Sequence, residues 1–370
     1  MTSETIPYAR GRDFYVPRFE VRLRGRPLGK EVVNDIQAAT VKDDIGQIDS
    51  FELTINNWDA EARTLKYSDK DLFDPGQELE LSFGYYGEDL RLMIRGDITS
   101  LRPTFPASGP PTLAVSGLNL LHRLRKAQGS FTYENMTDAE IAKQIAGRLS
   151  IPIEAVETNE KHDYLFQDNQ FDIVFLMERA RLIGYDLFVK EEDSNGNAGE
   201  SKLHFAPSVR VRDVAYKLTY GRSMIEFQPN LTTANQVGKV TVRGWDAVEK
   251  KEIVATATRD DIRTRGVGEA GGQSRLEQAY GDREEVIANQ PVPNKQEAER
   301  VAKETLERIA KDMVKATAST VGLPHLRAGT VVELDGDGKR FSGRYFVTAT
   351  THTIGESGYT TTFESRREEV

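Results

Sequence analysis

Short segments in which apolar and polar residues alternate restrict the fold of this chain more than any other feature. Five of them occur at short intervals in the first third of the sequence: FEVRLRG (19–25), SFELTIN (50–56), ELELSFGYY (78–86), LRLMIRGDITSL (90–101) and TLAVSGL (112–118). A period of two residues is typical of strands with one buried face. Glycines and prolines between the segments predict turns. This region therefore predicts a small barrel or sandwich rather than a parallel sheet.

Two helices are predicted after these strands. TDAEIAKQIAGRLSIP (137–152) begins with Thr137 and Glu140 in capping-box spacing and ends before Pro152. Its apolar stripe comprises Ile141, Ile145 and Leu149. In the second helix the residues with helical spacing are Ile173, Leu176, Met177, Ala180 and Ile183, and Gly184 is a suitable C-terminal cap.

A β-hairpin is predicted to follow the second helix. YDLFV (185–189) and KLHFAP (202–207) read as strands, and the polar segment 191–200 reads as the turn between them. Residues 123–220 are therefore expected to form a small α+β unit.

The last third of the chain returns to a strand pattern but contains one long helix. SMIEFQPN (223–230) and the segment 237–258 read as strands, and a polar, glycine-bearing segment follows at about 259–293. A helix is predicted from Asn294 to about Ala316. Its buried side would consist of Ala298, Val301, Ala302, Thr305, Leu306, Ile309 and Met313. Strand patterns resume in 327–336, 344–355 and 359–367.

The two ends of the chain share a pattern. DPGQELELSFG followed by LRLMIRGDITSL resembles LRAGTVVELDG followed by GRYFVTATTHTIG, since each has a glycine, a strand with a Glu-Leu pair, a turn and a longer strand. LAVSGLN (113–119) likewise resembles VTVRGWD (240–246), although the order of the matches differs between the halves. The pattern predicts two similar barrels joined by helical segments.

The expected fold class is α+β, mainly β, with two similar small β-barrel domains. The first barrel is expected in 1–122 and the α+β domain, with two helices and a hairpin, in 123–220. The second barrel is expected in 221–258 together with 320–370. The loop and long helix of 259–319 would be inserted in the second barrel.

Composition excludes several classes of protein. The chain has no cysteine, so disulfides, thiolate chemistry and cysteine-ligated zinc are excluded, and folding in a reducing compartment fits. The net charge of -9 argues against a duplex-binding surface. No apolar run approaches the roughly 20 residues that span a bilayer. The first residues lack the apolar core of a signal peptide.

The sequence offers no positive sign of an enzyme. GVGEAG (266–271) fits a dinucleotide-binding pattern, but the segment before it is charged, so a loop is the better interpretation. LDGDGK (334–339) has lysine where a calcium loop needs an oxygen ligand, which favours a tight hairpin turn. The five histidines lack any paired ligand spacing: His122, His162, His204, His325 and His352. We therefore expect no catalytic residues, no cofactor and no metal.

The stretch FQDNQFDIVFLMERARLIGYDLFV (166–189), with the capped helix before it and LHFAP after it, resembles the central signature of the phage late control gene D family. The N-terminal hub part of the VgrG spike proteins of type VI secretion is similar. The residues that carry the resemblance are Gln167, Asp172, Phe175, Leu176, Ala180, Gly184, Tyr185, Trp245 and Asp246, with Leu203 and Phe205 on the returning strand. Phe175, Leu176 and Ala180 would be core residues in any protein, Gly184 would cap any helix, and the charge of Asp172 would favour a helix N-terminus.

The resemblance implies a baseplate hub of a contractile injection machine, either a phage tail or a phage-derived particle. Such hubs are homotrimers in which two similar barrels per chain present six quasi-equivalent units, matching a sixfold inner tube to a threefold spike. The implied partners are the inner tube protein ring and a separate spike protein, with tape-measure and baseplate wedge proteins as more distant ones. Neither specific nucleic acid binding nor stable membrane insertion is expected. The protein would be made in the bacterial cytoplasm and assembled into the baseplate.

Two other classes stay open from the residues alone. Among the 58 carboxylates a glycosidase pair would leave no mark on sequence spacing, so a cell-envelope glycan hydrolase is one alternative. A monomeric β-rich binding module is the other. Turnover of glycan would identify the first, and mass in solution would test the second.

Overall fold

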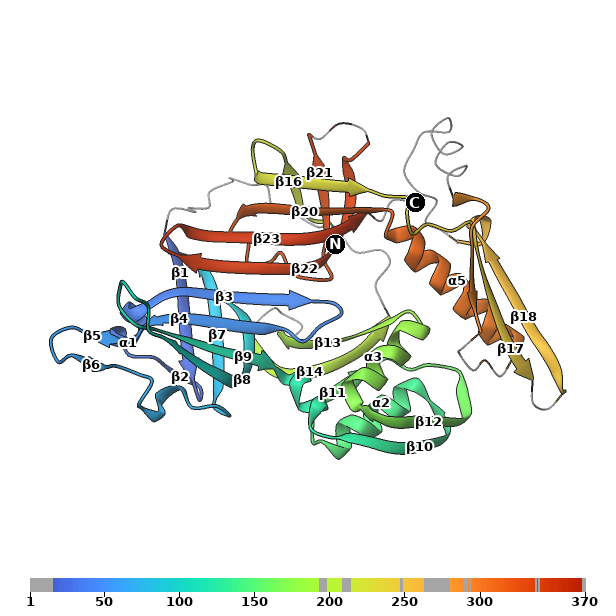
Figure 1. Ribbon diagram of the computed structural model, residues 1–370, viewed down its shortest axis with the longest axis horizontal. Helices are drawn as coiled ribbons and strands as arrows, with labels where there is room; N and C mark the ends of the chain where they lie inside the picture. The colour runs from blue at the N-terminus through green and yellow to red at the C-terminus, as the bar shows by residue number, and fades with distance from the viewer. Residues whose placement is uncertain are drawn as a thin grey trace.

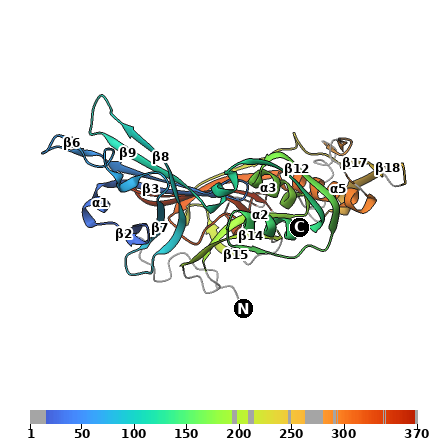
Figure 2. The same ribbon diagram turned by 90° about the horizontal axis from the view of Figure 1, so that it is seen from below.

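The computed structural model describes residues 16–192, 198–207, 214–246, 249–262, 280–288, 292, 294–336, 338 and 340–367. Strands predominate and helices are few, so the expected α+β, mainly β class is confirmed (Figure 1). The sheet strands of the two chain ends lie side by side across the molecule. Helices α2 (Asp138–Arg148), α3 (Asp172–Leu182) and α5 (Lys295–Lys311) lie toward the right-hand side of both views (Figures 1 and 2).

The first half of the sheet has six strands in addition to the two-residue strand Arg26–Pro27. They are β1 (Pro17–Leu23), β3 (Ile36–Asp44), β4 (Ser50–Asn56), β7 (Glu78–Tyr85), β8 (Arg91–Thr104) and β9 (Thr112–Asn119). Their hydrogen-bonded order is β3-β4-β9-β8-β7-β1, and every neighbouring pair is antiparallel. Smaller elements decorate the half: β2 (Arg26–Pro27), α1 (Lys30–Asp35), β5 (Trp58–Asp59), β6 (Thr64–Leu65) and η1 (Asp71–Phe73).

The alternation in these strands produces one apolar layer. Phe51, Leu53 and Ile55 of β4 are buried, as are Leu79, Leu81 and Phe83 of β7, while the residues between them are partly exposed. Burial of such a side chain contributes roughly 1.5–3 kcal/mol. The same cluster includes Ile354 and Tyr359 from the other end of the chain.

The α+β unit follows β9. Its elements are η2 (Leu120–Arg125), β10 (Gln128–Thr137), α2 (Asp138–Arg148), β11 (Ile153–Ala155), β12 (Lys161–Phe171), α3 (Asp172–Leu182), β13 (Tyr185–Glu192) and β14 (Ala198–Pro207). Both predicted helices are confirmed, and the capping box of Thr137 and Glu140 is formed. The predicted hairpin is confirmed as the antiparallel pair β13–β14. Strands β10 and β12, which pair with each other, were not predicted.

The second half of the sheet also has six strands. They are β15 (Val214–Thr219), β16 (Met224–Leu231), β20 (Val314–Val321), β21 (Val331–Asp335), β22 (Gly343–Gly355) and β23 (Gly358–Arg367). Their order is β16-β20-β23-β22-β21-β15. The antiparallel pairing of β21 with β22 confirms a hairpin here, but β21 ends at Asp335 and β22 begins at Gly343, so the connection is longer than a tight turn. Asp337 and Lys339 lie outside the described residues.

A separate unit is inserted between β16 and β20. Strands β17 (Lys239–Asp246), β18 (Lys251–Thr258) and β19 (Glu284–Ile287) form a sheet with η3 (Arg259–Asp261) at its end, and α5 (Lys295–Lys311) packs on it. The helix begins at the Asn294 cap as predicted but ends at Lys311 rather than near Ala316. The reason is that VKATASTV alternates with a period of two and forms β20, with Val314, Ala316 and Ala318 buried. The GVGEAG segment lies outside the described residues.

The two halves repeat one strand order. Read in chain order, β1, β3, β4, β7, β8 and β9 occupy the sheet positions of β15, β16, β20, β21, β22 and β23. Four of the five neighbouring pairs are antiparallel in both halves. The exception is the last pair, since β1–β7 is antiparallel whereas β15–β21 is parallel.

The repeat extends to individual residues. Gly76 and Gly329 both have φ near the left-handed region, at 90° and 83°. Each donates its backbone N–H to a carbonyl of the long strand, Gly76 to Ile98 at 2.7 Å and Gly329 to Val347 at 2.8 Å. The Glu-Leu pairs of the sequence match fall at equivalent positions, since Glu80 lies opposite Arg95 of β8 just as Glu333 lies opposite Arg344 of β22.

Two details of the sequence expectation are corrected. VTVRGWD forms β17 in the separate insert sheet, and the strand that occupies the position of LAVSGLN (β9) is β23. A short alternating pattern does not encode its partner strand, which explains the false match. Barrel closure is not found among the described strands, because the six strands of each half and β2 belong to one open sheet of 13 strands.

Candidate functional site

The two halves are joined by a strand pair. The end of β22 pairs antiparallel with β3, from Ala39 opposite Ile354 to Asp44 opposite Ala349. The ladder continues where the N–H of Ile45 donates to the carbonyl of Thr348 at 3.0 Å. This β3–β22 joint makes one sheet of the two halves, and it is the structural centre of the chain.

A buried carboxylate lies at the joint. Asp43 of β3 is 5% exposed, and its Oδ2 accepts hydrogen bonds from Arg327 Nε at 2.7 Å and from the backbone N–H of Ala328 at 3.0 Å. Its Oδ1 accepts from the hydroxyl of Thr350. Arg327 belongs to the connection between β20 and β21, so Asp43 ties that connection to both strands of the joint.

The electrostatics of the joint keep Asp43 charged. Burial by itself would raise the pKa of Asp43, but Arg327, His352 and the hydrogen bond from Thr350 together lower it below its usual value. The charge of Asp43 in turn helps to raise the pKa of Arg327, against the effect of burial. A charged, hydrogen-bonded pair of this kind is costly to break, because one charge then stays buried alone.

His352 is the buried histidine of the joint. Burial lowers its pKa to about 4, so the ring is neutral at neutral pH. Its Nε2 lies 2.9 Å from the carbonyl of Leu326, and a carbonyl can only accept, so Nε2 carries the proton. Nδ1 then accepts from the hydroxyls of Tyr359 at 3.0 Å and Thr361 at 3.1 Å. Every polar atom of the ring is satisfied, and the histidine therefore serves as a core residue.

The outer edge of β15 has no ladder partner among the described residues, and two further strand edges of the sheet have none either. One is the outer edge of β8 beyond Ile98, where β7 ends and β9 pairs with the other side. The other is the outer edge of β16, which pairs through its inner side with β20. Leu101 is partly buried, whereas Phe105 after the end of β8 is 62% exposed. Open edges with apolar side chains are sites for strand addition.

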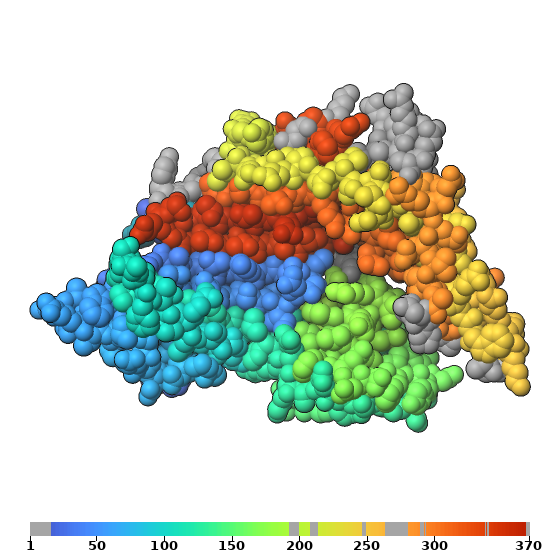
Figure 3. Space-filling view, viewed as in Figure 1, coloured from blue at the N-terminus to red at the C-terminus, as the bar shows by residue number. Residues whose placement is uncertain are grey.

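A cleft of about 2290 Å³ separates the α+β unit from the insert. The α+β unit and the insert flank it in the space-filling view (Figure 3). Exposed aromatic side chains lie on both walls: Tyr164 and Phe166 on β12, and Trp245 on β17. Carboxylates and guanidinium groups make up much of the remaining lining.

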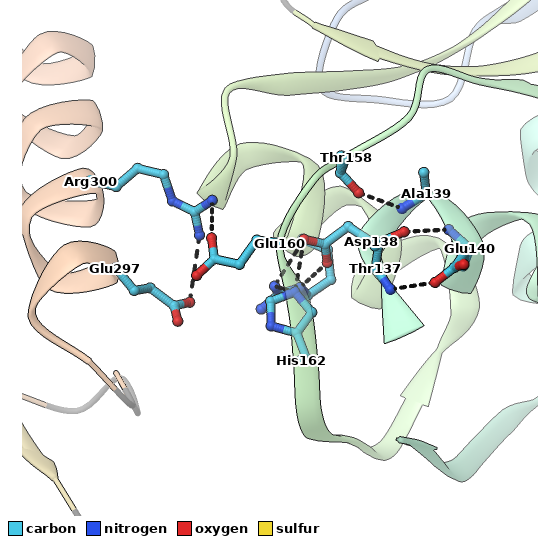
Figure 4. A network of polar contacts seen from close by, with 10 residues as sticks. Thr137, Asp138, Ala139, Glu140, Thr158, Glu160, His162, Glu297 and Arg300 are labelled. Atoms are coloured by element: carbon cyan, nitrogen blue, oxygen red, sulfur yellow. Dashed lines mark hydrogen bonds and ion pairs between the residues drawn. The ribbon is translucent and has the colours of Figure 1, made fainter. Parts of the chain in front are cut away.

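An ion-pair network connects the two walls of the cleft. Arg300 of α5 lies 2.9 Å from Glu160 and 3.6 Å from Glu297 (Figure 4). Burial and the charge of Glu160 raise the pKa of Glu297. Behind Glu160, the buried Asp138 accepts from Arg179 at 2.6 Å and lies 3.0 Å from His162. These groups neutralise each other, so the network fixes the two units relative to one another.

The signature residues of the α+β unit lie together in its core. Gln167 is fully buried, accepts from the Tyr133 hydroxyl at 3.0 Å and donates to Asp172 at 3.0 Å. Asp172 also accepts from Arg148 at 2.6 Å. Phe175, Leu176 and Ala180 are buried in the same cluster, Gly184 has a φ of 68°, and the Tyr185 hydroxyl donates to the carbonyl of Glu157 at 3.2 Å.

The two remaining signature residues lie elsewhere. Trp245 is 59% exposed on β17, and Asp246 is the last residue of that strand, paired with Lys251. The structure therefore does not bring them together with the α+β group. Sequence reasoning missed Asp43, Arg327 and the open edge of β16. The signal that could have found β3 is the alternation of Val41 and Asp43 with polar residues in IQAATVKDD.

No helix of the described residues is long and apolar enough to span a membrane. No curated protein matches this chain in sequence.

Several solved structures are similar in fold. The 43 kDa tail protein of prophage MuSo2 from Shewanella oneidensis is 15% identical with a TM-score of 0.71, over 95% of this chain and 98% of that one. The tail protein from Neisseria meningitidis MC58 is 14% identical with a TM-score of 0.69, over 95% and 97%. A chain of the Francisella PdpA-VgrG complex is 11% identical with a TM-score of 0.56, over 95% and 52%.

At these identities the likeness establishes the fold. The family model described as "Alg8 N-terminal domain" matches residues 15–356, and the chain belongs to that family.

Proposed function

We propose that this protein is a structural, non-enzymatic hub in the baseplate of a contractile injection machine, a phage tail or a phage-derived particle. The likeness to phage tail proteins and to a VgrG complex supports that setting. The gene D resemblance of residues 166–189 points the same way. The single observation that carries the proposal is the strand order repeated in the two halves of one chain.

The repeat supplies what a symmetry adaptor needs. Three copies of a chain with two similar halves present six similar sheets around an axis, so the ring can meet a sixfold tube protein ring on one side. The α+β unit and the insert have different folds and occur once per chain, so the same ring offers threefold symmetry to a separate spike protein. Tape-measure and wedge proteins would be more distant partners.

Mass in solution and location in the particle test this proposal. We expect native mass spectrometry to give three times the chain mass of 41.5 kDa, either for the chain alone or after addition of the tube protein. Electron microscopy of the assembled particle should then place the chain between tube and spike. A chain that stays monomeric with the tube protein present, and that is absent from the tube–spike junction, would overturn the proposal.

A further inference from the structure

We infer that the open edge of β8 in one copy pairs antiparallel with β16 of the next copy, in the register in which β22 pairs with β3 within a chain. This inference rests on the proposed ring of copies. It adds the strands, the register and the side chains that form the contact between copies.

The first step is the equivalence of β16 and β3. Both are edge strands of their half, and both pair antiparallel with a strand at the same sheet position, β20 and β4. Both carry a bulge at their first residues, at Ile225 and at Gln37. Matching the partners across the bulge aligns Phe227 with Ala39 and Leu231 with Asp43.

The second step is the equivalence of β8 and β22. β8 pairs with β7 along its first part and with β9 along its second part. β22 pairs in the same way with β21 and then with β23. The change occurs at a bulge, at Thr99 in β8 and at Thr348 in β22. Counting from the bulge aligns Leu101 with Thr350 and Phe105 with Ile354. The second part of β22 has β3 on its outer side, whereas that of β8 has no described partner there.

The third step transfers the joint to the pair of open edges. Asp43 opposite Thr350 becomes Leu231 opposite Leu101. In the same way, Ala39 opposite Ile354 becomes Phe227 opposite Phe105, and Val41 opposite His352 becomes Pro229 opposite Pro103. The transferred register therefore places apolar residues opposite apolar residues at three successive positions on the face that is buried in the joint.

The other face of the same pair is polar. The transferred register places Asn230 opposite Arg102 and Gln228 opposite Thr104, and these four residues are exposed. Both edges thus have one apolar and one polar face, and the two faces coincide. A shift by one residue would place apolar residues opposite the polar face, so the pattern excludes that shift.

Two prolines, Pro229 and Pro103, lie opposite each other at the centre of the inferred pair. In the joint, Ile45 donates to Thr348, and hydrogen-bonded pairs alternate, so Val41 opposite His352 is a hydrogen-bonded pair. The equivalent Pro229 and Pro103 have no N–H, and the missing donors face the open edges. Each edge therefore lacks its central donor, so the inferred pair has neither of the two hydrogen bonds at its centre. The hydrogen-bonded pairs on either side, Leu231 with Leu101 and Phe227 with Phe105, keep their N–H donors.

Engineered disulfides test the register, because the chain has no cysteine of its own. We expect Arg102→Cys with Asn230→Cys in one chain to link neighbouring copies under oxidation and to give a covalent trimer on a denaturing gel. The matched positive control is Lys42→Cys with Thr351→Cys, which occupies the equivalent positions inside one chain and should give a cross-linked monomer. The register control is Arg102→Cys with Glu226→Cys, displaced along β16, and should give no cross-link.

The outcomes separate this inference from the proposed function. A covalent trimer from the Arg102 and Asn230 pair, absent from the displaced pair, supports the inferred contact. A trimeric mass without that cross-link, while the Lys42 and Thr351 control reacts, overturns the contact and leaves the hub proposal standing. A chain that forms no trimer with the tube protein, although it folds and the control reacts, overturns both.

Discussion

Replacement of Arg327 by methionine should destabilise the protein strongly, because it leaves the buried Asp43 without its charged partner. The arginine Nε donates to the Asp43 carboxylate at 2.7 Å, and the Asp43 side chain is 6% exposed in that pair. Methionine keeps most of the aliphatic volume of arginine but carries no donor. The substitution therefore isolates the charge effect from a packing effect.

The magnitude follows from the partners that remain. Removal of one member of a buried ion pair costs about 3–5 kcal/mol. Asp43 keeps the N–H of Ala328 and the hydroxyl of Thr350, so we expect the lower end, about 3 kcal/mol. Because Arg327 also lowers the pKa of Asp43, the loss should be larger at neutral pH than in acid, where the carboxyl can take up a proton.

Urea unfolding at neutral pH gives the free energies to compare. The control is Arg243→Met, the same substitution in an exposed pair, since Arg243 and Glu252 are 57% and 56% exposed and 3.4 Å apart. That change should cost about 0–1 kcal/mol. If Arg327→Met costs no more than Arg243→Met, the joint does not depend on the buried pair and our reading of its electrostatics is wrong.

Two further predictions concern backbone and pH. Gly147→Ala, in an exposed helical position with open space around it, should stabilise the chain by about 0.5–1 kcal/mol, whereas Gly96→Ala should destabilise it by at least about 1–3 kcal/mol. The new Cβ of the second variant would lie 2.3 Å from the carbonyl oxygen of Leu118, and thermal unfolding of both variants checks the opposite signs. The pKa of His352 is lowered from 6.5 to about 4 in the folded protein. Between these pH values the unfolded chain binds a proton at His352 that the folded protein does not bind, so the free energy of unfolding falls as the pH drops from 6.5 to 4. The wild type should lose about 3 kcal/mol over that range relative to His352→Gln, and equal pH profiles would contradict the assignment.

The strands and helices with strong local patterns could be predicted from the sequence. The capped α2 and the glycine-terminated α3 follow from side-chain spacing, and the strands around Glu80 and Glu333 follow from alternation. β10 and β12 could not be predicted in this way. They pair only with each other, and most of their residues are exposed, so the alternation of buried and polar residues is weak.

The candidate site is harder to predict because its parts are distant in sequence. Asp43 and Thr350 meet across the joint, yet nothing near either residue indicates the other. His352 lies in the Thr-rich strand TATTHTIG, whose hydroxyls look solvent-facing, although the ring and its hydroxyl partner Thr361 are fully buried. Such burial depends on which strand pairs with β22, and the spacing of residues within one strand does not indicate its partner.

The connection after β3 differs from its counterpart after β16. The first is a short turn that leads directly into β4, whereas the described residues of the second include β17, β18, β19 and α5 before β20 begins. Both begin and end at equivalent points of a repeated frame, so the length of the second can change while the sheet keeps its pairing. A partner that binds the repeated strands finds two equivalent surfaces in each polypeptide. A partner that binds the insert between β16 and β20 finds one.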